Sequence, residues 1–168
     1  MNIVKQRIQE SIDTKKRIVE DETLLNGIML IAQTIIDKIR AGGSVYFCGN
    51  GGSAADAQHL AAELSGRFYF DRQPLPSDAL HCNTSFLTAV ANDYSFDIIC
   101  SRLISGIGKK GDVLVGLSTS GNSKNITKAF EKCKEMGIYT IGFTGETGGE
   151  MKKIADACIC VPATDTPR

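Results

Sequence analysis

Two short loops rich in glycine and hydroxyl side chains carry the clearest chemical pattern in this sequence. The first, Gly49–Ser53, reads Gly-Asn-Gly-Gly-Ser, and the second, Ser118–Ser123, reads Ser-Thr-Ser-Gly-Asn-Ser. Glycines let the backbone turn at positive φ and let a ligand approach closely. Hydroxyls beside the N–H groups of a helix N-terminus bind an anion without any Arg. Together the two loops predict a site for a phosphorylated small molecule.

Each loop also has a plainer interpretation. The first is G-x-G-G, not the G-x-G-x-x-G of dinucleotide sites, and the chain has no G-x-x-x-x-G-K-[ST]. It could be a structural tight turn in which Ser53 caps the following helix. The second could hold one capping serine with the other hydroxyls in solvent. Two such loops at the ends of two strands favour the phosphate interpretation.

A histidine and a glutamate form the second chemical pattern. His59 and Glu63 are four residues apart in a helical stretch, so they project from one face. This spacing suits proton transfer or a shared metal ion, although its order is the reverse of H-E-x-x-H. The alternative is a surface ion pair. Asn92 and Asp93 add amide and carboxylate groups that can bind sugar hydroxyls, or they form an ordinary Asn-Asp turn.

Short apolar runs alternate with helical stretches after residue 43, which predicts a parallel sheet covered on both faces. The expected fold class is α/β, with a five-stranded, doubly wound parallel sheet. The expected strands are Ser44–Cys48, Ala79–Cys82, Asp112–Leu117, Ile138–Phe143 and Ala157–Val161. The expected helices lie near 53–67, 85–105, 122–136 and 148–155.

The first forty residues predict two amphipathic helices, because apolar residues recur at helical spacing and Gly42 and Gly43 end the second one. We expect one domain over 1–168, with this helical pair at 1–41 and the α/β core at 42–168. Two helices offer more apolar surface than a small sheet needs. We therefore expect part of that surface to contact another subunit, the alternative being packing within one chain.

Composition bounds the remaining possibilities. The 168 residues carry 19 basic and 19 acidic side chains, which predicts no nucleic-acid partner. No apolar run is long enough to span a bilayer and the first residues form no secretory signal, so we expect no membrane association and a cytoplasmic protein. The six cysteines should be free and mostly buried, the alternative being a zinc or disulfide cluster.

The quoted runs also resemble a known family. CGNGGSAADAQHLAAELSGRF, LTAVANDYSFD, GDVLVGLSTSGNS, TGETGGEM and VPATDTPR occur in order over almost the whole chain. They are similar to the sugar isomerase (SIS) domain family, and most similar to its phosphoheptose isomerase branch. That resemblance implies a flavodoxin-like fold. It also implies an aldose–ketose isomerase that converts D-sedoheptulose 7-phosphate to D-glycero-D-manno-heptose 7-phosphate, the first step of nucleotide-activated heptose synthesis for surface polysaccharide.

The resemblance implies residue roles as well. The substrate contacts would be Asn50, Gly51, Gly52, Asn92 and Asp93. The phosphate would be held by Ser118, Thr119, Ser120 and Ser123, with help from Ser53. Glu63 would be the acid/base group, and His59 with Glu63 would bind zinc in members that hold it. The resemblance also implies a homotetramer with active sites between subunits.

In one respect the sequence departs from the family. The family continues past the residue matching Arg168 with a further helix, whose Gln and His supply the second acid/base group and two metal ligands. We expect this chain to be part of a longer protein, the alternative being a truncated, inactive form. With His59 and Glu63 alone, we expect no zinc to be held in this chain.

Other functions are weighed against the isomerase. The main alternative is a non-catalytic SIS regulator that binds a sugar phosphate or a partner protein of the replication-initiator type. The regulator-like branch lacks the carboxylate that Glu63 supplies, so this residue favours the enzyme. An N-acetylmuramic acid 6-phosphate etherase or a hexose-phosphate isomerase domain fits the length and the QHLAAELSGR segment less well.

Overall fold

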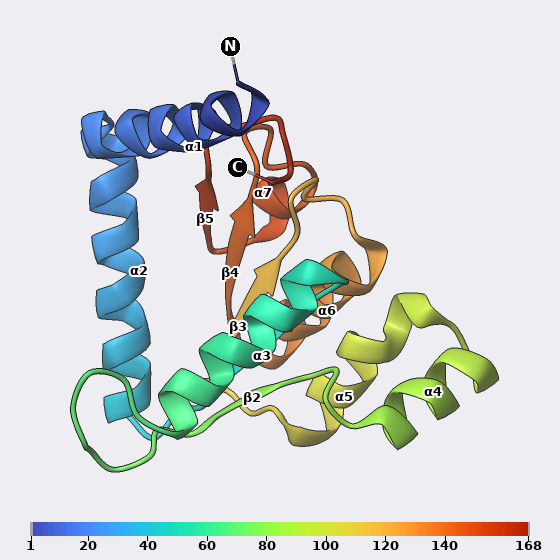
Figure 1. Ribbon diagram of the computed structural model, residues 1–168. Coiled ribbons are helices and arrows are strands. Elements are labelled where there is room, and N and C mark those ends of the chain that lie inside the picture. Colours follow the sequence, from blue (N-terminus) through green and yellow to red (C-terminus); the bar gives the residue numbers. More distant parts are fainter. Residues whose placement is uncertain (1, 168) are drawn as a thin grey trace.

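A computed structural model describes residues 2–167. Arg168, after which the family would continue into a further helix, lies outside the described residues. Its centre is a five-stranded, all-parallel sheet in the order β2-β1-β3-β4-β5 (Figure 1). The strands are β1 (Val45–Gly49), β2 (Ser77–Ala79), β3 (Val113–Leu117), β4 (Tyr139–Thr144) and β5 (Ala157–Cys160). This order is the flavodoxin-like one, and the predicted fold class is confirmed.

Helices cover both faces of the sheet. They are α1 (Ile3–Glu20), α2 (Glu22–Arg40), α3 (Gly52–Ser65), α4 (Thr84–Asp93), α5 (Ile99–Ile107), α6 (Lys124–Met136) and α7 (Met151–Ile154), with a short 3₁₀ helix, η1 (Phe96–Ile98). In β3, Val113 and Val115 pack against α2 and α3, while Leu114 packs against the α4 to α7 side. A strand buried on both faces must be apolar throughout, which explains its sequence.

The predicted elements are corrected in three places. The strand expected at Ala79–Cys82 lies instead at Ser77–Ala79, because the ladder with β1 ends at Leu80 and a turn follows. The single helix expected at 85–105 is broken into α4, η1 and α5. The break occurs because the Ser95 hydroxyl accepts a hydrogen bond from the Asp97 N–H and caps a new helix. The expected helix at 148–155 is shortened to α7.

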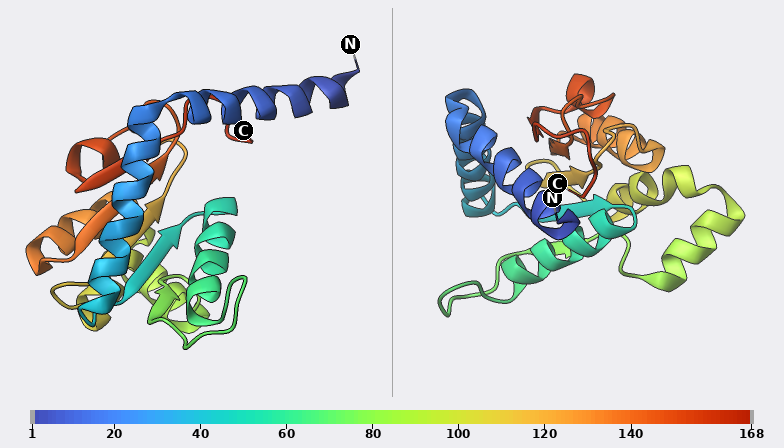
Figure 2. Two further views of the ribbon diagram at one scale, coloured as in Figure 1. Left: turned by 90° about the vertical axis from the view of Figure 1, so that its left-hand side faces the viewer. Right: turned by 45° about the horizontal axis from the view of Figure 1, so that its top comes forward.

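The N-terminal pair is partly separate from the sheet. α2 packs its apolar stripe on the sheet through Ile31 and its neighbours, whereas Thr14 is the only buried residue described in α1. Figure 2 shows α1 extending away from the body of the molecule. No helix within residues 2–167 combines the length and the apolar character that crossing a bilayer requires.

The six cysteines are free thiols, three buried, two half-buried and one exposed. Burial raises the pKa of Cys133 to about 12 and that of Cys158 to about 11. A thiol with a raised pKa stays protonated, and therefore unreactive, until the pH approaches that value.

Cys82 is the exposed thiol, although partial burial and the nearby Asp78 raise its pKa somewhat. We expect Ellman's reagent at pH 8 to modify Cys82 in a fast phase of one thiol per chain, because access limits the others. The Cys82→Ser variant should lose that phase. A fast phase that survives in the variant would contradict the assignment.

Candidate active site

The tips of β1 and β3 lie side by side, with Gly49 opposite Leu117 in the register. α3 leaves the tip of β1 on one face of the sheet, and α6 leaves the tip of β3 on the other. Such a switch point opens a crevice at the carboxyl ends of parallel strands, where ligands bind. Both loops singled out in the sequence follow these two strands, at the same edge of the sheet (Figure 1).

A cavity of about 330 Å³ occupies the crevice. It is lined by Asn50, Gly52, Ser53, Leu117, Ser118, Thr119, Ser120, Ser123 and Thr166. The two loops are therefore walls of one cavity, and seven of the predicted substrate-binding residues line it.

The first loop turns tightly into α3. A Cβ on Gly49 would come 2.3 Å from the backbone oxygen of Ser53, and Gly51 has φ +56. The N–H groups of Ala54 and Ala55 donate to the Gly51 carbonyl. Gly51 is therefore the N-cap of α3 and no side chain caps this helix. The expectation that Ser53 caps it is wrong, since Ser53 lies inside the first turn and faces the cavity.

The second loop is closed by its own hydroxyls. The Ser118 and Ser123 hydroxyls lie 2.9 Å apart in a hydrogen bond across the loop, and the Gly121 N–H donates to the Ser118 carbonyl. The Ser120 hydroxyl accepts from the Asn122 N–H. No side chain caps α6 either, so two helix N-termini and several hydroxyls face one small space.

A third segment, the loop after β4, supports the second loop from behind. The Gly145 N–H donates to the Thr119 carbonyl over 2.9 Å, and the Met151 N–H donates to the Gly121 carbonyl over 3.0 Å. The Glu150 N–H donates to Asn122 Oδ1. These bonds fix the loop before any ligand arrives, which lowers the entropic cost of binding.

The groups that can attract an anion in the cavity are helix N-termini, N–H groups and hydroxyls, not cationic side chains. Among the described residues that line it there is no Lys, Arg, Asp or Glu. The N-terminal ends of α3 and α6 each contribute roughly half a positive charge, and N–H groups and hydroxyls supply the donors. Such a cradle suits a phosphate group.

His59 and Glu63 lie further along α3. His59 Nε2 is 3.3 Å from Glu63 Oε1, and the side chains are 73% and 31% exposed. At 1.5 Å per residue, Glu63 is about 15 Å along the helix from Ser53. Neither side chain lines the cavity, so the structure pairs the two residues but places them outside the phosphate cradle of their own chain.

The C-terminal end of α3 is held by a residue that the sequence analysis missed. The Arg72 guanidinium donates to the backbone carbonyls of Glu63 and Leu64, over 2.8 and 2.9 Å. These bonds satisfy carbonyls that a helix end leaves free. Arg72 thereby fixes the turn that carries the Glu63 carboxylate.

Asn92 and Asp93 end α4 and are exposed. Asn92 Nδ2 donates to Asp93 Oδ1 over 2.9 Å. They do not line the cavity that the two loops form.

The residues present do not make a zinc site. Within residues 2–167 no three His, Cys, Asp or Glu side chains come together as a metal centre would require. His59 and Glu63 offer two donors, whereas zinc sites use three or four protein ligands. The chemistry derived below therefore uses no metal.

Two further segments reach the crevice without having been predicted. Thr166 lines the main cavity, and smaller hollows beside it are lined by Gly145, Glu146 and Thr147 from the loop after β4. The loop after β4 could have been predicted from the hydroxyl residues at the end of that strand, Thr144 and Thr147. Thr166 lies in a segment without helix or strand, so no hydrophobic periodicity in the sequence could predict where its side chain lies.

The comparisons with known proteins agree with this geometry. Residues 8–145 match the model of the SIS domain. A phosphoheptose isomerase from Clostridium acetobutylicum is 50% identical over 167 residues, which cover 99% of this chain and 85% of that protein. One from Rhodospirillum rubrum is 60% identical over 137 residues, 82% of this chain and 73% of that protein. The structure of phosphoheptose isomerase from Neisseria gonorrhoeae has a TM-score of 0.91 and 38% identity, and covers 98% of this chain and 86% of that chain.

A doubly wound parallel sheet with two glycine and hydroxyl loops at its switch point is the architecture of a sugar-phosphate-binding α/β domain. The chain belongs to the SIS domain family, and within it to the phosphoheptose isomerase branch. Relatives that carry an enzyme's name favour the isomerase over the non-catalytic regulator.

Proposed function

We propose that this chain is an isomerase that interconverts D-sedoheptulose 7-phosphate and D-glycero-D-manno-heptose 7-phosphate. The observation that carries the proposal is the single cavity in which both hydroxyl-bearing loops meet, because it suits a phosphate monoester. The names of the relatives support the choice of substrate. In a cell, the reaction would begin the synthesis of nucleotide-activated heptose for surface polysaccharide, and we place the protein in the cytoplasm.

The proposed reaction needs a base and a proton donor. A base removes a proton from C1 of the ketose while O2 gains a proton, which gives an enediol. A proton then returns to C2 as O1 loses one, which leaves the aldehyde at C1. We assign the carbon-bound proton to the Glu63 carboxylate and the oxygen-bound proton to His59, which lies within 3.3 Å of it. Asn50, Asn92 and Asp93 would hold the sugar hydroxyls, and Gly51 and Gly52 let the substrate approach the backbone.

Turnover is the direct test of the proposed function. We expect the purified protein, in the longest native form, to convert sedoheptulose 7-phosphate, and the dephosphorylated sugar to be a much poorer substrate. Losing the hydrogen bonds to a charged group costs about 1.5–3 kcal/mol each. Equal turnover of both sugars would contradict the phosphate site, and no turnover of either would contradict the function.

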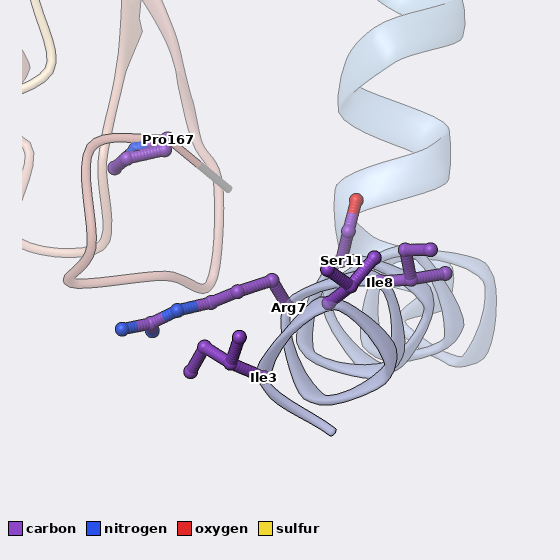
Figure 3. Close-up of a pocket in the computed structure, with 6 residues that line it drawn as sticks. Ile3, Arg7, Ile8, Ser11 and Pro167 are labelled. Carbon is purple, nitrogen blue, oxygen red and sulfur yellow. The ribbon is translucent and has the colours of Figure 1, made fainter.

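We also propose that the working form is a homo-oligomer, a tetramer by the family resemblance. Apolar side chains of α1 are exposed in the single chain, among them Ile3, Val4 and Ile8. A hollow of about 430 Å³ lies between them and Pro167. In Figure 3, Ile3 and Arg7 reach from α1 toward the segment that carries Pro167. Monomeric proteins rarely leave such surfaces uncovered.

The oligomer would also complete the active site. Glu63 stands about 15 Å along α3 from the phosphate cavity of its own chain, so we assign it to a cavity in another copy. Zinc, which the family resemblance suggests, would need ligands beyond His59 and Glu63. We propose no nucleic-acid partner, since the formal net charge is zero.

Subunit mixing tests this arrangement. Ser120→Asp puts a negative charge in the phosphate cavity and Glu63→Gln removes the base, so each variant alone should be nearly inactive. If one site uses both residues from different copies, random mixing of equal amounts should restore roughly a quarter of the sites. Activity no higher than the sum of the two variants would place both residues of a site on one chain.

A further inference from the structure

The first phosphate loop and the start of α6 are joined by a pair of side-chain amides. Asn50 Nδ2 donates to Asn125 Oδ1 over 2.9 Å, and Asn125 Nδ2 donates to Asn50 Oδ1 over 2.9 Å. The bonds are reciprocal, so each amide uses one donor and one acceptor on the other. Two short bonds between planar groups fix both distance and orientation.

The two partners differ in exposure. Asn125 is buried, with 2% of its surface exposed, and its second N–H points to Cys100 Sγ at 3.8 Å. Asn50 is half-buried and lines the phosphate cavity, whereas Asn125 does not. If the pair broke, Asn125 would lose both of its short hydrogen bonds and keep only the long contact to Cys100 Sγ.

The pair also fixes the loops relative to each other. Asn50 follows β1, and Asn125 is the second residue of the helix that begins after Ser123. The two phosphate loops come from different strands, and this side-chain contact joins the first loop to the helix that follows the second. The pair leaves Asn50 one N–H and one lone pair, which are the groups it can offer to a ligand in the cavity.

We propose that Asn125 is a positioning residue: it holds the Asn50 amide in the orientation that binds the sugar, and it sets the spacing of the two phosphate loops. This inference rests on the proposed isomerase function. It assigns no contact between Asn125 and the substrate, because the side chain acts through Asn50 alone.

A double-mutant cycle separates this role from a general effect on folding. Asn50→Ala and Asn125→Ala should each lower kcat/KM by about 10-fold to 100-fold, the scale of one or two lost hydrogen bonds. If Asn125 acts through Asn50, the double variant should be no worse than Asn50→Ala, within about two-fold. Effects that multiply, or an unchanged Asn125→Ala variant, would overturn the proposal.

Cys100→Ala is the matched control. It removes the other neighbour of the Asn125 amide but leaves the pair with Asn50 intact, so kcat/KM should stay within about two-fold of the parent value. All variants are measured at a temperature at which circular dichroism shows them folded. A Cys100→Ala variant as impaired as Asn125→Ala would assign the effect to core packing and overturn the proposal.

A second readout needs no substrate. In protein labelled with ¹⁵N-asparagine, the Asn50 side-chain amide should show slow hydrogen exchange in the parent chain. In Asn125→Ala its signals should shift and exchange at the rate of a free amide. Unchanged Asn50 signals would overturn the proposal whether or not the protein is active. Absent turnover with this NMR change would instead contradict the proposed function alone.

Discussion

The Glu63→Gln variant should lose isomerisation of sedoheptulose 7-phosphate by about 100-fold to 10,000-fold in kcat, the usual contribution of a positioned general base. Glutamine keeps the shape of the side chain and can still accept a hydrogen bond from His59, but it cannot take a proton from carbon. Arg72 holds this turn through the backbone carbonyl of Glu63, which the substitution leaves in place. The helix should therefore keep its place in the variant.

Binding should survive the same substitution. The phosphate cavity is formed by other residues. The binding free energy of sedoheptulose 7-phosphate, measured by calorimetry, should therefore change by less than about 1 kcal/mol. Glu131→Gln, at an exposed position on α6, is the matched control for loss of one carboxylate and should leave turnover unchanged. Unchanged turnover in Glu63→Gln would remove Glu63 from the chemistry.

The central sheet could be predicted because buried parallel strands are almost entirely apolar. In β3 the run Val113, Leu114 and Val115 is apolar on both faces, as expected of a strand covered by helices on both sides, and each residue is buried. The edge strand β2 could not be placed as well. Its Ser77 and Asp78 are polar, and the adjacent apolar residues belong to the turn that follows.

The walls of the phosphate cavity could be predicted for a different reason. Glycine and hydroxyl residues at the ends of two strands favoured a phosphate site over a structural turn, and the register of the sheet places Gly49 opposite Leu117. The amide pair of Asn50 and Asn125 could not be predicted, because the partners are 75 residues apart and a helical Asn has no periodic pattern. The i, i+4 spacing predicted that His59 and Glu63 share one helix face, but it could not predict where that face lies relative to the cavity.

Gly121→Ala should destabilise the fold and weaken phosphate binding together. Gly121 has φ +66, and a Cβ there would lie 2.0 Å from the carbonyl oxygen of Gly148. That oxygen accepts the Lys152 N–H, and Gly148 N–H donates to Gly145, so it cannot move without breaking the segment that supports the loop. We expect a loss of about 3–5 kcal/mol in the free energy of unfolding, measured in urea, because strain and overlap add.

Gly111→Ala separates the two contributions. Gly111 also has positive φ, +95, but a Cβ there meets nothing within 4 Å. Alanine at this position should cost only the backbone strain, about 1–2 kcal/mol, and should leave the Kd for the sugar phosphate unchanged. The difference between the two variants is then the cost of the overlap with Gly148. Equal destabilisation would mean that the loop after β4 yields freely, and that the second phosphate loop is not held in place by it.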